Sequence, residues 1–132
     1  MEADTVNVAS GLYRNFLKKA EECFNAMNES YSKAEWNMAV IAAVHCGISS
    51  ADALTVKFKG VRHSGMRHEG VVKLLNTLDI PEAYKKNRQL LNILRLKSAA
   101  EYEHKLMSQS DASEAVRDTE RFYKWVKEVL KE

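Results

Sequence analysis

The sequence predicts an all-α protein, an up-and-down bundle of four to five helices in one domain. Three observations predict this fold: apolar residues recur at steps of three and four, little alternates with a period of two, and there is one proline. The 132 residues are enough for one domain with a single core. We therefore expect a single domain over residues 1–132, with its core at about residues 10–130.

The first two predicted helices cover about residues 10–29 and 32–59. The second is expected to start at "SKAE", where Ser32 and Glu35 have the spacing of a capping box, and to end at Gly60. It is rich in small residues ("AVIAAVHCGISSADAL"), which allow neighbouring helices to approach closely. We therefore expect this helix at the centre of the bundle.

Three further helices complete the predicted bundle. A short one covers "HEGVVKLLNTL", and Asp79 and Pro81 mark the start of the next, whose apolar stripe continues to Leu106. The segment "SQSDASE" then interrupts the pattern and caps the last helix. That helix holds Ala115, Phe122, Trp125, Val126 and Val129.

Composition argues against several classes of protein. The net charge is +2, from 20 basic and 18 acidic residues, so any contact with nucleic acid has to be local. Cys23 and Cys46 form no CxxC pair, which argues against a structural zinc site, and we expect neither metal nor cofactor. The N-terminus does not look like a signal peptide, and we expect no apolar run that approaches the ~20 residues of a membrane span. We expect a cytoplasmic protein without a membrane partner.

The stretch "KFKGVRHSGMRH", residues 57–68, gathers basic residues and histidines without an acid. Arginine can hold two phosphate oxygens at once, and histidine can donate or accept a proton near neutral pH. Its glycines would let backbone N–H groups approach a ligand, and a helix N-terminus follows. The alternative is a solvated basic connector between two helices. The candidate phosphate- or nucleotide-binding residues are Lys57, Arg62, Arg67, His68 and Arg95.

A second group of polar residues lies beside the apolar stripes. Asp52 sits one to two turns before the end of the central helix, and Arg95 precedes Glu101 and Tyr102 at roughly helical intervals. We expect Asp52, Glu101 and Tyr102 to support the site. The alternative is structural: an aspartate paired with a nearby arginine, and an internal network that fixes helix packing. His45 has no partner at metal-ligand spacing.

Three segments resemble the HEPN family of small helical domains, whose name stands for higher eukaryotes and prokaryotes nucleotide-binding. They are "WNMAVIAAVHCGISSADALT", "GVRHSGMRHEGVVKLL" and "LLNILRLKSAAEYE". The resemblance covers roughly residues 10–128 and is to a divergent prokaryotic member. It implies a bundle of four or five helices that usually acts as a dimer.

The resemblance also implies candidate activities. Many members of the family carry an Arg-x4-6-His motif and cleave RNA without a metal, whereas others bind nucleotides or partner proteins. Many bacterial members pair with a nucleotidyltransferase as the toxin half of a toxin–antitoxin system. Arg62 and His68, with five residues between them, have the motif's spacing, and Arg67 is a second candidate arginine. His63 replaces the polar residue that commonly follows the arginine, and "RLKSAAEY" looks more like a divergent subgroup.

Three functional hypotheses follow. The favoured one is a homodimeric domain that binds nucleotide or RNA, as the toxin or partner half of a nucleotidyltransferase-linked system. The second is a metal-independent endoribonuclease, in which His68 acts as general acid or base and Arg62 stabilises charge on phosphorus. The third is a protein-interaction or dimerisation module without catalysis, which would expose a large apolar face.

Overall fold

The computed structural model describes residues 4–65 and 68–131, and it gives no side-chain detail for residues 68 and 69. The predicted all-α fold is confirmed. The long helices are α1 (Tyr13–Ser32), α2 (Trp36–Lys59), α4 (Ala83–Leu94) and α6 (Gln109–Val129), joined by the shorter α3 (His68–Asn76) and α5 (Lys97–Glu101). A 3-10 turn, η1 (Ser10–Leu12), precedes α1, and two short strands, β1 (Thr5–Asn7) and β2 (Val61–His63), flank one end.

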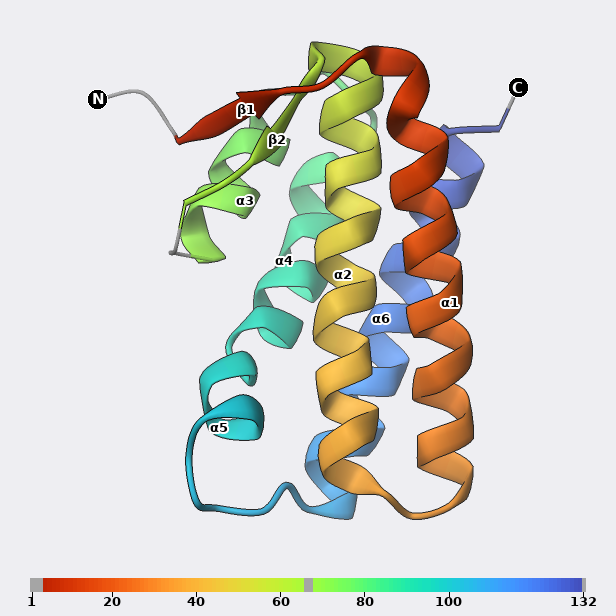
Figure 1. The fold of residues 1–132 in the computed structure, drawn as a ribbon, viewed down its shortest axis with the longest axis vertical. Coiled ribbons are helices and arrows are strands. Elements are labelled where there is room, and N and C mark those ends of the chain that lie inside the picture. Colours follow the sequence, from red (N-terminus) through yellow and green to blue (C-terminus); the bar gives the residue numbers. More distant parts are fainter. Residues whose placement is uncertain (1–3, 66–67, 132) are drawn as a thin grey trace.

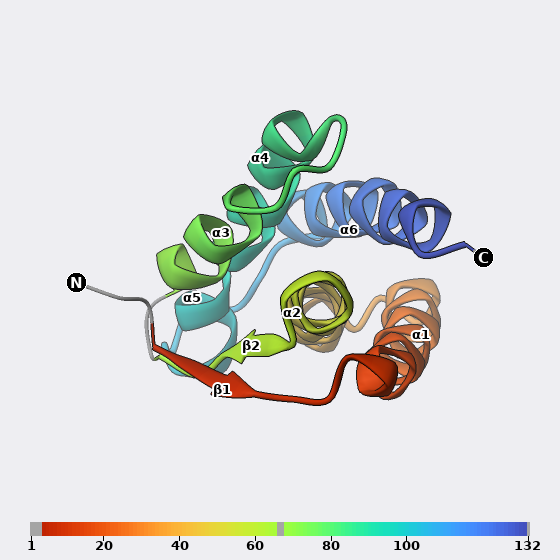
Figure 2. The same cartoon turned by 90° about the horizontal axis from the view of Figure 1, so that it is seen from above.

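The four long helices run alternately down and up the bundle (Figure 1). Seen from above, α2 lies between α1 on one side and α3 and α4 on the other, with α6 across the back (Figure 2). Its small residues allow this central position: a Cβ on Gly47 would lie 3.2 Å from Cδ1 of Leu90 in α4. The expectation that this helix is central is therefore confirmed.

By length and composition, α2 could cross a membrane, since its 24 residues include an 18-residue window of mean hydropathy 1.5. Sequence reasoning had recognised no apolar run of that length, and this judgement was wrong. However, 78% of the window is buried within the bundle. A core helix covered on several sides has the same apolar composition, because every face needs an apolar neighbour.

Two of the predicted helix ends are confirmed by their backbone geometry. Gly60 follows α2 with a φ of 66°, a left-handed conformation that favours glycine. At the start of α6, Ser108 Oγ accepts from the N–H of Asp111 at 3.0 Å, and the Asp111 carboxylate accepts from the N–H of Ser108 at 3.0 Å. This reciprocal pair is a capping box, and it confirms that "SQSDASE" caps the last helix.

Two local predictions were wrong, and two short strands were missed. Ser32 does not cap α2; it ends α1, and its hydroxyl donates to the carbonyl of Glu29 at 2.7 Å. The long fourth helix is broken after Leu94, and α5 begins at Lys97. The strands were not predicted, because β1 and β2 have three residues each, too few to show a period of two. They pair antiparallel, with Val6 opposite Arg62.

Candidate functional site

Four polar residues near the Gly60 end of α2 form what we call the Arg62 edge: Asp52 and Lys57 of α2, Arg62 of β2 and Arg14 of α1. Gly60 turns the chain out of α2, and the pairing of β2 with β1 then fixes the backbone of Arg62. Arg62 is half-buried, and its Nη1 donates to the carbonyl of His63 at 3.3 Å. A short strand thus holds this arginine beside α2.

Asp52 is the acidic partner at this edge. It is only 8% exposed, and burial raises the pKa of its carboxyl to about 7. The positive charge of Arg62, the backbone N–H of His63 and, more weakly, the charge of Lys19 oppose that rise. Because this pKa lies near neutrality, a modest change in pH alters how much of the Arg62 charge is compensated.

Lys57 and Arg14 flank one buried aromatic ring. Nζ of Lys57 lies 4.7 Å from the ring centroid of Tyr13, and Cζ of Arg14 lies 4.9 Å from it. Tyr13 is 6% exposed, and both cations lie close to its ring, where α1 packs against α2. Sequence reasoning missed Arg14, because only the packing of α1 on α2 brings it to the same ring as Lys57.

The ring of His63 lies against two glycines, Gly65 of the basic stretch and Gly70 of α3. A Cβ on Gly65 would lie 2.9 Å from Nε2 of His63, and a Cβ on Gly70 would also overlap the His63 ring. The ring therefore packs against both glycines, and these positions accommodate a side chain of the same protein. Arg67 lies outside the described residues, as does the side chain of His68, the first residue of α3.

The structure does not bring Arg95 to the Arg62 edge. Arg95 follows α4 and lines a pocket of about 450 Å³ between α4 and α6. Its Nη1 lies 3.5 Å from Oδ1 of Asn92. The pocket is lined by Asn92, Arg95, Leu96, Glu114, Ala115, Arg117 and Asp118. Arg95 also does not share the ion pairs of Glu101, whose partners are His45 and Lys97.

Glu101 instead joins α5 to α2. Its Oε1 lies 2.8 Å from Nε2 of His45, and its Oε2 lies 3.3 Å from Nζ of Lys97. The Lys97 ammonium also lies 5.3 Å from the ring centroid of Tyr102. The hydrogen bonds and charges of Lys97 and His45 lower the pKa of the Glu101 carboxyl against the opposing effect of burial. The partner of His45 is 56 positions away, so sequence spacing did not reveal it.

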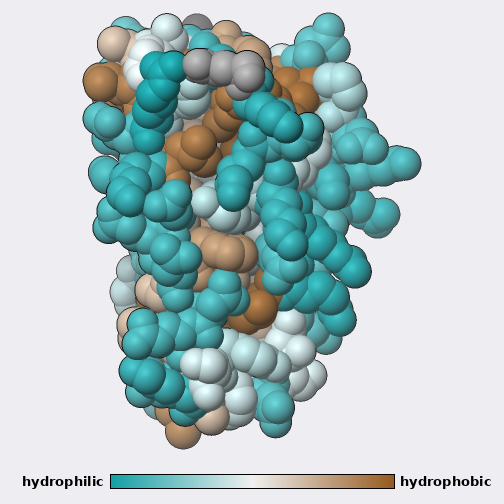
Figure 3. Space-filling model, turned by 90° about the vertical axis from the view of Figure 1, so that its right-hand side faces the viewer, coloured by the Kyte–Doolittle hydropathy of each residue, from teal (hydrophilic) through white to brown (hydrophobic). Residues whose placement is uncertain are grey.

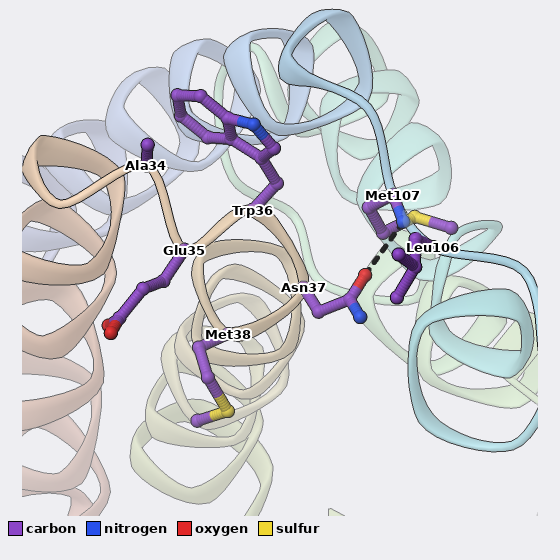
Figure 4. A pocket seen from close by; sticks show the side chains of 7 residues that line it. All are labelled: Ala34, Glu35, Trp36, Asn37, Met38, Leu106 and Met107. Carbon is purple, nitrogen blue, oxygen red and sulfur yellow. Dashed lines mark hydrogen bonds between the residues drawn. The ribbon is translucent and has the colours of Figure 1, made fainter.

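Two apolar features lie away from both clusters. At the opposite end of α2, Ala34, Glu35, Trp36, Asn37, Met38, Leu106 and Met107 line a pocket of about 360 Å³ (Figure 4). Figure 3 shows an apolar strip between α1 and α6 within a hydrophilic surface. In that region, the partly buried Leu17, Cys23 and Phe24 of α1 pack against Tyr123 of α6. Neither feature includes a residue expected in the site.

Among residues 4–65 and 68–131, no group of three or more His, Cys, Asp or Glu side chains is close enough to hold a metal ion.

Residues 13–129 match the family model of the HEPN domain. The chain belongs to the HEPN family. The resemblance inferred from the sequence is thereby confirmed, and this family is generally concerned with nucleotides or RNA. The family match covers all the long helices and the Arg62 edge.

Two solved structures share the fold of this HEPN domain. TT1696 from Thermus thermophilus superposes with a TM-score of 0.72 at 17% sequence identity, over 90% of this chain and 98% of that one. ST0689, described as an archaeal HEPN homologue, gives a TM-score of 0.59 at 17% identity, again over 90% and 98% of the two chains. A search of curated proteins gave no match.

Proposed function

We propose that this HEPN domain binds the phosphate groups of a nucleotide or RNA at the Arg62 edge. The observation that carries the proposal is the placement of Arg62, which a short strand holds beside the buried Asp52. Because Arg62 is already held in place, its side chain loses less conformational entropy when two N–H groups of its guanidinium bind one phosphate. Lys57 and Arg14 add positive charge at the same end of the bundle.

Asp52 gives the proposed site a dependence on pH. Its carboxylate competes with a phosphate for Arg62, whereas its protonated form does not. Since the pKa of Asp52 is raised to about 7, the competing charge decreases as the pH falls through that value. We therefore expect phosphate affinity to be higher at pH 6 than at pH 8, and this difference to be smaller in Asp52→Asn.

The binding test uses a fluorescent mixed-sequence RNA of twelve nucleotides, with 5′-UMP as competitor. Arg62→Ala should weaken RNA binding and lower the slope of log affinity against log salt by about 1. Arg88→Ala is the matched control, because Arg88 is an arginine of α4, away from the Arg62 edge. If both variants bind as the wild type does, the proposal is wrong.

A metal-independent endoribonuclease is the second candidate function. The observation that favours it is the chain order: β2 carries Arg62, and the next element, α3, begins at His68. Arg62 would stabilise charge on phosphorus, while His68 would transfer a proton to or from the reacting hydroxyl. RNA cleavage in EDTA by the wild type, and its loss in a folded His68→Ala variant, would support this activity. Equal cleavage by both would contradict it.

We also propose that the protein acts in the cytoplasm as a homodimer or with a nucleotidyltransferase-like partner. The exposed side chains of Met38 and Leu106, and the apolar strip between α1 and α6, are surfaces that suit such contacts. Light scattering on the purified chain gives its mass in solution. A monomer at all concentrations would contradict the homodimer and leave the partner protein as the interaction to examine.

A further inference from the structure

A second polar cluster lies on the face of α2 that carries Asp52 of the Arg62 edge. We call it the Tyr102 cluster, and its residues are His45, Lys97, Glu101 and Tyr102. His45 lies seven residues before Asp52, which is close to two full turns of helix, so both side chains leave α2 in nearly the same direction. At 1.5 Å per residue, the two positions are about 10 Å apart along the helix axis.

Hydrogen bonds fix the position of the Tyr102 cluster. Glu101 is held between His45 at 2.8 Å and Lys97 at 3.3 Å, and its side chain is only 13% exposed. The carboxylate thus orients the Lys97 ammonium, which can donate to a phosphate, and the His45 ring, which donates from Nε2 to Glu101 and can accept from a ribose hydroxyl at Nδ1. The His45 side chain is 49% exposed and can still meet a ligand from solution.

The aromatic ring of Tyr102 is the most accessible part of the cluster. Tyr102 is 75% exposed, and the ammonium of Lys97 lies 5.3 Å from its ring centroid. Proteins that bind single-stranded nucleic acid combine exposed aromatic rings with positively charged side chains. Bases stack on the rings, and the positive charges attract the phosphates. A ring that only packed into the core would not be so exposed.

We propose that the Tyr102 cluster is a second contact site for single-stranded RNA, with a base stacked on Tyr102 and backbone groups held by His45 and Lys97. This inference rests on the proposed binding of RNA at the Arg62 edge and extends it along α2. The two sites lie at different heights along α2, since His45 and Asp52 are about 10 Å apart along the helix axis. A strand, and not a mononucleotide, would therefore reach both sites.

The experiment measures the affinity of the full chain for the twelve-nucleotide RNA and for 5′-UMP. Tyr102→Ala should weaken binding of the twelve-nucleotide RNA by roughly 5- to 150-fold, the effect of losing one stacked base. Tyr102→Phe should bind like the wild type, because stacking requires the ring and not its hydroxyl group. Tyr84→Ala is the matched control, since Tyr84 is 81% exposed at the start of α4 and away from the cluster.

Two further measurements separate stacking from charge. Lys97→Met keeps most of the side chain's length, removes its charge and should lower the salt slope by about 1. Binding of 5′-UMP should change with Arg62→Ala and not with Tyr102→Ala. Melting temperatures of all variants show whether they fold, and the exposure of Tyr102 predicts little change for its variants.

The outcomes distinguish this inference from the proposed function. If Arg62→Ala weakens RNA binding while Tyr102→Ala matches Tyr84→Ala and the wild type, the second site is wrong and the first stands. If Tyr102→Phe is as weak as Tyr102→Ala, base stacking is wrong. If the wild type binds no RNA, both proposals are wrong.

Discussion

The backbone N–H of Met107 donates a 2.7 Å hydrogen bond to Oδ1 of Asn37, which lies 70 positions earlier in the chain (Figure 4). Met107 is 6% exposed, so water has little access to this N–H. The bond ties the segment between α5 and α6 to the first turn of α2. The start of α6 is thereby positioned by a side chain as well as by its own capping box.

We expect Asn37→Ala to lower the free energy of unfolding by about 1–3 kcal/mol, because it leaves a buried N–H without an acceptor. Asn37→Asp keeps an acceptor oxygen at the same place and should lose less. Urea unfolding of both variants and the wild type measures the difference. Equal stability of Asn37→Ala and the wild type would mean that this bond adds nothing to the fold.

The raised pKa of Asp52 predicts how stability changes with pH. The unfolded chain releases this proton near the ordinary value of 3.8, whereas the folded protein keeps it up to about 7. Between pH 3.8 and about 7, the folded state therefore binds more protons than the unfolded state. The Asp52 proton contributes its full stabilisation below pH 3.8, and this stabilisation decreases as the pH rises to about 7.

Asp52→Asn should remove that decrease, because asparagine does not titrate and can still accept from the N–H of His63. The wild type should lose up to roughly 4 kcal/mol between pH 4 and 7 relative to this variant. Denaturant unfolding at several pH values provides the comparison. Parallel curves for the two proteins would show that Asp52 titrates normally. The lowered pKa values of Glu101 and Asp111 affect stability at lower pH, outside most of this range.

The capping box at α6 gives a third prediction. Ser108→Ala removes the oxygen that accepts from the N–H of Asp111, and it should cost about 1 kcal/mol of stability. Ser110→Ala, in the first turn of the same helix, removes a hydroxyl outside the capping box and serves as the control. A thermal melt of each variant is sufficient. A loss of the same size in Ser110→Ala would argue that helix propensity, and not capping, is responsible.

The close approach of α2 to α4 gives a fourth prediction. The Cβ of a residue at position 47 would lie 3.2 Å from Cδ1 of Leu90 and 3.8 Å from Cδ1 of Ile93. Gly47→Val adds two further methyl groups there, and we expect it to cost about 1–3 kcal/mol. At Gly11, an added Cβ meets nothing within 4 Å, so Gly11→Val is the control. If the two variants unfold at the same urea concentration, the interface between α2 and α4 has room to adjust.

Local sequence determined much of this protein. The helical spacing of apolar residues predicted the bundle, the small residues predicted the central place of α2, and Gly60 and Ser108 marked two helix ends. These features depend on residues within a few positions of one another, so the local sequence is enough to predict them. Three quoted segments were also enough to indicate the HEPN family.

Tertiary structure decided which polar residues contact one another. His45 pairs with Glu101 across 56 positions, Arg62 of β2 lies near the buried Asp52 of α2, and Arg95 lines a pocket between α4 and α6. Such contacts depend on how separate elements pack, since a side chain's partner is set by distance in space and not by spacing along the chain. The sequence therefore predicted the bundle, while packing decided which residues gather around His45 and around Asp52.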